Sequence, residues 1–150
     1  MIENRRLSDK IIVVFLCCLI LIIGLRHIEY CNVIIVLNDE FGYWGIAASA
    51  AGYNWNDMMS LTPYYGFGYS AILFLFIKMG ASVAIAYKIA ILANVLMLLA
   101  SFLLAVYCGH RLFPNINYRI VCIGSFVALC YCNTLFQSQI AWAETYLYFL

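Results

Sequence analysis

Three long stretches without a charged residue dominate the pattern of the chain, and they predict helices that cross a membrane. These stretches are Ile11 to Leu25, Ile89 to Gly109 and Ile120 to Ala143. A helix needs roughly 20 mostly apolar residues to cross the hydrocarbon core of a bilayer. We therefore expect membrane spans at about residues 9–29, 83–108 and 119–137. The fold class that follows is an all-α membrane protein with multi-pass transmembrane helices.

The last apolar run begins at Leu147 and stops at Leu150, which is too short to cross a bilayer. It predicts the start of another span at 141–150. We therefore expect residues 1–150 to be the N-terminal part of a single transmembrane domain, and the chain to be truncated.

The residues before the first span are polar and include three basic side chains, Arg5, Arg6 and Lys10. Basic residues beside a span are retained in the cytoplasm. No small-x-small cleavage site follows the apolar run, so this span is not read as a signal peptide. We expect a cell-membrane protein with a cytoplasmic N-terminus.

Residues 30–80 then form an outer loop in which we expect interfacial helices. Phe41 to Gly52 mixes apolar and small residues, which predicts a short helix along the membrane surface with Gly52 as its C-cap. Pro63 occupies a position that is typical of a helix start. Aromatic residues of the kind found at headgroup depth occur through this loop: Tyr43, Trp44, Tyr53 and Trp55.

The segment 64–79 leaves two topologies open, because its apolar part is short for a span. If it crosses the membrane, the later loop with Arg111 and Arg119 lies outside, and Lys78 lies inside. If it lies at the outer face, that loop is cytoplasmic. The excess of basic residues in the later loop favours the second topology.

Composition excludes several classes of function. The chain is 67% hydrophobic and 10% charged with a net charge of +1, so it has no basic surface for nucleic acid. Its seven cysteines and two histidines show no metal-binding spacing. No serine-hydrolase elbow, zinc-protease motif or phosphate-binding loop occurs either.

The second topology brings charged residues from distant parts of the chain to one membrane face. They are Asp39, Glu40, Lys78, Lys88 and Glu144. A carboxylate beside a lysine suits a phosphate-linked substrate, because the carboxylate accepts a proton and the lysine neutralises phosphate. The alternative interpretation is that these side chains only reach towards water at helix ends.

These elements resemble the opening of the GT-C glycosyltransferases, which include protein O-mannosyltransferases and aminoarabinose transferases. The resemblance lies in a basic start, one span, the pair Asp39-Glu40, a proline-led segment from Pro63 to Tyr69, and Lys88 before a long span. Glu144 resembles the acidic residue that opens a later helix in that family. The chain departs from the family at Thr62-Pro63-Tyr64-Tyr65, where many members have a Pro-Pro pair.

The resemblance implies an inverting glycosyltransferase that moves a sugar from a polyprenyl-phosphate donor to an acceptor at the outer membrane face. Asp39 is the expected general base, and Glu40 supports it or binds the acceptor or a divalent metal. The expected substrate-binding residues are Lys88, Glu144, Tyr43, Trp44 and Tyr65. The partners are then the bilayer and the lipid-linked sugar, and we expect the fragment alone to be inactive. A transporter or flippase for lipid-linked sugars and a structural membrane subunit are the alternatives.

Overall fold

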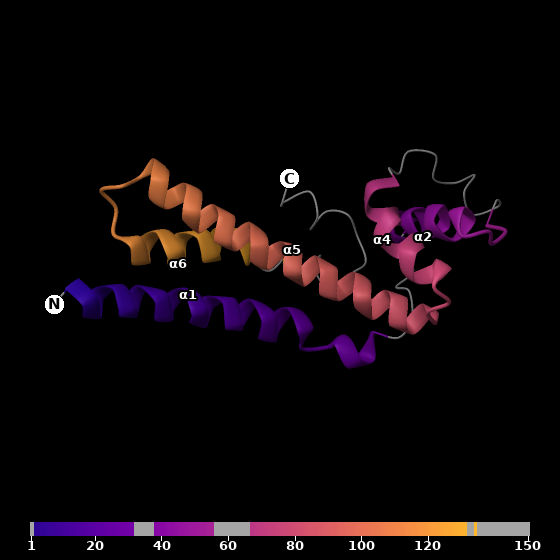
Figure 1. Ribbon diagram of the computed structural model, residues 1–150, viewed down its shortest axis with the longest axis horizontal. Helices are drawn as coiled ribbons and strands as arrows, with labels where there is room; N and C mark the ends of the chain where they lie inside the picture. Colours follow the sequence, from indigo (N-terminus) through magenta and orange to yellow (C-terminus); the bar gives the residue numbers. More distant parts are fainter. Residues whose placement is uncertain (1, 32–37, 56–66, 132–133, 135–150) are drawn as a thin grey trace.

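The computed structural model describes residues 2–31, 38–55, 67–131 and 134, and these residues are helical or in turns, without a strand (Figure 1). The elements in chain order are α1 (Ile2–Leu25), the 3-10 turn η1 (Ile28–Tyr30), α2 (Asn38–Ala50), α4 (Phe67–Lys78), α5 (Val83–Leu112) and α6 (Tyr118–Leu129). The expectation of an all-α fold is confirmed for this part of the chain.

Helices α1, α5 and α6 form one packed group. In Figure 1, α1 and α5 run in opposite directions along the long axis, and α6 lies beside them at the end that holds the N-terminus. One hydrophobic cluster joins all three helices, and its buried members are Leu16, Ile20, Leu98, Phe102, Val106 and Cys122. Phe102 also meets Phe126 of α6 edge-on, with 6.2 Å between the ring centroids.

Two helical glycines allow these helices to approach closely. A Cβ atom on Gly24 of α1 would lie 2.8 Å from Val95 Cγ2 of α5. A Cβ atom on Gly109 of α5 would lie 2.8 Å from Val121 Cγ1 of α6. Small residues at contacts between apolar helices let the backbones come together and increase van der Waals contact. Gly24 and Gly109 therefore mark the tight contacts of the group.

The outward faces of these helices are apolar. Within the described residues, Leu7–Tyr30 and Val83–Leu112 are long and apolar enough to cross a membrane. Phe15 and Ile22 of α1 are 60% and 65% exposed, and Leu104 of α5 is 48% exposed. A core helix of a soluble protein hides such side chains, whereas exposed apolar faces of this extent mark contact with lipid or a partner. The two helices thus indicate association with a membrane.

Helices α2 and α4 pack together at the other end of α5, away from the N-terminus (Figure 1). A second cluster joins them to the first half of α5, with Trp44, Tyr69, Leu73, Tyr87 and Ile91 among its buried members. Glycines with a positive φ end both helices, Gly52 at 99° and Gly80 at 78°. Tyr53 N–H donates to Ala48 O and Ala81 N–H to Phe76 O, so each end is a Schellman cap. The expected C-cap at Gly52 is present, although α2 begins at Asn38 rather than at Phe41.

The segment between α1 and α5 enters and leaves at the same end of the molecule. Cys31, just after η1, packs against the cluster of α2, α4 and α5, and η1 contacts α5. At the opposite end, Arg119 at the start of α6 pairs with Asp9 of α1 at 3.0 Å. The turn after α5 therefore lies at the same end of the molecule as the start of α1.

The helix bounds differ from the expected spans in particular places. Helix α5 continues beyond residue 108 to Leu112, and Pro114 follows, where the residue before a proline avoids the helical region. Helix α6 ends at Leu129, well before residue 137, and the N–H of its C-cap Cys130 donates to Phe126 O. The expected start of a further span at 141–150 lies outside the described residues.

Candidate functional site

The candidate site is the end of the molecule where α2 meets α5. Trp44 of α2 is 2% exposed, and its indole stacks on Tyr87 of α5 with 6.1 Å between the ring centroids and an interplanar angle of 18°. Lys88, the next residue of α5, is half-buried. The stack therefore couples the helix that carries the acidic pair to the turn that carries the lysine.

The acidic pair occupies the first turn of α2. Asp39 and Glu40 directly follow Asn38, the first residue of the helix, and stand one turn before Tyr43 and Trp44. Their side chains lie outside the described part of the structure. Acidic residues in a first turn are stabilised by the helix dipole, by about 0.3–1 kcal/mol each. Stabilisation by the helix dipole therefore explains the position of Asp39 and Glu40 without a substrate, beside the catalytic role expected from the sequence.

Trp44 is buried and Tyr43 is half-buried, and both belong to the packing between α2, α4 and α5. Tyr43 meets Tyr69 of α4 edge-on at a centroid distance of 5.4 Å. Trp44 Nε1 is buried and has no hydrogen-bond partner among the described residues. Buried indole N–H groups usually find a partner. The Trp44 ring therefore contributes to packing, and its N–H group can still donate a hydrogen bond.

A cavity of about 170 Å³ borders Trp44 on the side of α4. Its lining joins α2, the residues after it, and the connection from α4 to α5: Trp44, Ala48, Tyr53, Trp55, Ile77, Ala81 and Val83. The rings of Trp44, Tyr53 and Trp55 give it flat apolar walls. Such a lining suits a ligand with an apolar face, such as a sugar ring or part of an isoprenoid chain.

The pKa of the Cys31 thiol is affected by the charge of Lys88. Burial raises the pKa of the Cys31 thiol, and the positive charge of Lys88 acts in the opposite direction. The end of η1 and the first turns of α5 are therefore close enough for the ammonium to affect a neighbouring group.

Not all of the expected site residues are brought together. Tyr65 and Glu144 lie outside the described residues, so the structure does not place them. Lys78 is exposed in the last turn of α4, where a cation is stabilised by the helix dipole. Its position needs no substrate to explain it.

Tyr87, whose ring stacks on Trp44, is not among the site residues expected from the sequence. It directly precedes Lys88, but its contact with Trp44 joins residues far apart in the chain. Within the described residues, no group of three His, Cys, Asp or Glu side chains is arranged to hold a metal ion.

Comparisons with protein-family models, with curated proteins and with solved structures find no match to this chain. The assignment of a function therefore depends on the residues and their arrangement.

Proposed function

We propose that the chain is the N-terminal part of a multi-pass GT-C-type glycosyltransferase of the plasma membrane, with a cytoplasmic N-terminus. The main observation that supports this proposal is the stack of Trp44 on Tyr87. It joins the helix that holds Asp39 and Glu40 to the turn of α5 that holds Lys88. An aromatic cavity lies beside this junction, at one end of two helices long enough to cross a bilayer. This position supports the proposal, because the phosphate of a lipid-linked sugar lies near the ends of membrane-spanning helices.

The proposed reaction moves a sugar from a polyprenyl-phosphate donor to an acceptor at the outer face. Asp39 removes the proton from the acceptor hydroxyl, and the hydroxyl oxygen then attacks the anomeric carbon of the sugar. The bond from that carbon to the phosphate oxygen breaks, and the configuration inverts. The polyprenyl phosphate leaves with the bonding electrons, and Lys88 stabilises its negative charge. Glu40 supports Asp39 or binds the acceptor or a divalent metal.

The test is an in vitro transfer assay on the full-length protein with Asp39→Asn. Loss of a general base lowers the rate by about 10²- to 10⁴-fold. Glu29→Gln is the matched control, because Glu29 is an exposed carboxylate in η1, near the same end of the molecule. We expect the control to keep its activity. Transfer by the Asp39→Asn variant at a near wild-type rate would exclude Asp39 as the base.

A second readout separates the transferase from its rivals. Vesicles that contain a fluorescent lipid-linked sugar report movement between leaflets, while chromatography reports transfer to an acceptor. Movement without transfer would identify a flippase, whose charged residues line a path through the bilayer. If the full-length protein shows neither movement nor transfer, the result would favour a structural subunit.

A further inference from the structure

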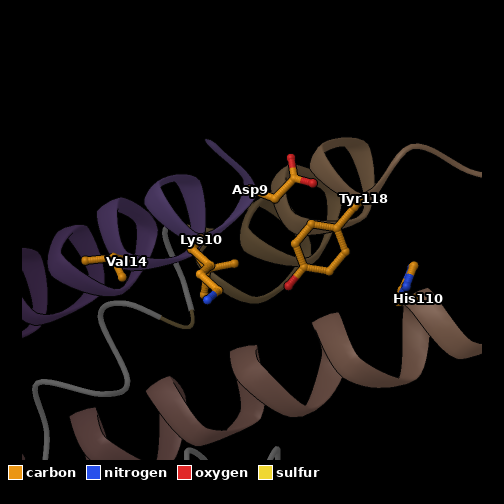
Figure 2. A pocket seen from close by; sticks show the side chains of 6 residues that line it. Asp9, Lys10, Val14, His110 and Tyr118 are labelled. Carbon is orange, nitrogen blue, oxygen red and sulfur yellow. The ribbon is translucent and has the colours of Figure 1, made fainter. Parts of the chain in front are cut away.

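A larger cavity lies at the opposite end of the molecule, where α1, α5 and α6 meet. Its volume is about 550 Å³, and it is lined by Asp9, Lys10, Val13, Val14, His110 and Tyr118. Figure 2 shows Lys10 and Val14 on α1, His110 at the end of α5, and the Tyr118 ring of α6 between the two helices. The proposed transfer reaction uses none of these residues.

The charged groups at this cavity sum to +1 when Arg119, which pairs with Asp9 but is not part of the lining, is counted. Asp9 Oδ1 accepts a hydrogen bond from Arg119 Nε at 3.0 Å, and Arg119 Nη2 donates to Ser8 Oγ at 2.8 Å. This pairing offsets the charge of Asp9. The Lys10 ammonium is then the charged group of the lining that is not part of this ion pair, with the His110 imidazole as a second donor.

His110 is held at the rim by an aromatic neighbour. Its ring meets Tyr118 edge-on, with 5.2 Å between centroids and an interplanar angle of 87°. Tyr118 is the first residue of α6, and His110 is in the last turn of α5. The two helix ends therefore fix the imidazole on the far side of the cavity from Lys10.

The apolar part of the lining lies deeper along the same helix. Val13 and Val14 are one turn beyond Lys10 in the direction of the apolar run of α1, and Val14 is 60% exposed. This segment belongs to the helix that is long and apolar enough to cross a membrane. A polar rim above an apolar wall matches a molecule with an anionic head and a hydrocarbon tail.

We propose that this cavity binds one anionic phospholipid, with its phosphate between Lys10 and His110 and an acyl chain along Val13 and Val14. Lysine binds phosphate as a point charge, and the imidazole supplies a second donor. A free phosphate ion gains nothing from the valines, so the mixed lining favours the lipid. Clustered cations at helix ends are a feature of lipid headgroup sites.

The experiment uses the purified full chain in nanodiscs of phosphatidylcholine with a minor fraction of phosphatidylglycerol. Native mass spectrometry then counts the phosphatidylglycerol molecules that stay bound after lipid removal. We expect one retained molecule for the wild type and about fivefold less retention for Lys10→Gln, from the loss of one cation near the surface. Lys10 is exposed, so its replacement leaves the helix packing intact.

Arg111→Gln is the matched control. Arg111 is an exposed cation one residue from His110, and its guanidinium lies 5.4 Å from the centroid of the Tyr107 ring, outside the cavity lining. The control should retain the lipid as the wild type does. Equal losses for Lys10→Gln and Arg111→Gln would show only a general surface potential and would overturn the site.

A second variant tests the apolar wall without changing the charge. Val14→Phe fills the space proposed for the acyl chain and should reduce retention of phosphatidylglycerol about as much as Lys10→Gln. Displacement of the bound lipid by inorganic phosphate would instead assign the cavity to a free anion. Retention of phosphatidylcholine in equal amount, or a second copy of the chain seated on this face, would also overturn the proposal.

Discussion

The contact between α1 and α5 depends on the absence of a side chain at Gly24, and replacing this residue with alanine tests the packing. A Cβ atom there would lie 2.8 and 2.9 Å from the two γ carbons of Val95 and 3.4 Å from its Cβ. Val95 is fully buried, at 0% exposure. Its β-branched side chain has one strongly preferred rotamer in a helix, so it cannot turn away from the new methyl group.

The expected magnitude follows from two opposed effects. Forcing an extra carbon into a packed contact costs about 1–3 kcal/mol. Alanine in place of glycine returns up to about 1 kcal/mol of helix propensity, and less near the end of α1, where Gly24 lies. The net loss for Gly24→Ala should therefore be about 1–2 kcal/mol. Gly124→Ala in α6 is the control, because a Cβ atom there meets nothing within 4 Å. It should be neutral or stabilising by up to about 1 kcal/mol.

Equilibrium unfolding in mixed detergent micelles, followed by tryptophan fluorescence, measures both variants. A double-mutant cycle with Val95→Ala then isolates the clash, because that change removes both γ carbons that the new methyl would meet. The double variant should be more stable than the sum of the single effects predicts, by about 1 kcal/mol or more. Effects that add within about 0.5 kcal/mol would refute the clash.

Two further predictions concern charged groups at opposite ends of the molecule. Arg119→Gln removes the pair with Asp9, whose side chains are 41% and 24% exposed, so the free energy of unfolding should fall by less than about 1 kcal/mol. Lys10→Gln, which removes an exposed cation beside Asp9 in α1, should leave the free energy of unfolding unchanged. An equal effect of the two variants would show that the pair contributes nothing. Cys31 should react slowly with maleimide at neutral pH, because burial raises the pKa of its thiol and only the thiolate reacts. Lys88→Gln removes the charge that lowers this pKa, so the labelling profile should move to higher pH; an unchanged profile would contradict the coupling.

The long helices were predictable because they depend on local composition. A long uncharged apolar run favours a helix, and α1 and α5 contain the runs Ile11 to Leu25 and Ile89 to Gly109. Gly52 was predictable as a C-cap for a similar reason, since a glycine after a small-residue helix readily adopts the positive φ that the cap requires. The end of α6 at Leu129 was not predictable, because the apolar run continues past it without a proline or glycine.

The sequence alone determined that the chain is helical, that it carries two helices suited to a membrane, and that an acidic pair follows the first of them. These properties depend on residue types within one stretch. Only the tertiary structure decided that Trp44 stacks on Tyr87 beside Lys88, and that Asp9 pairs with Arg119 beside the cavity lined by Lys10 and His110. Such contacts join residues that are distant in the chain. They arise from the packing of whole helices, of which the close contact of α1 and α5 at Gly24 is one example.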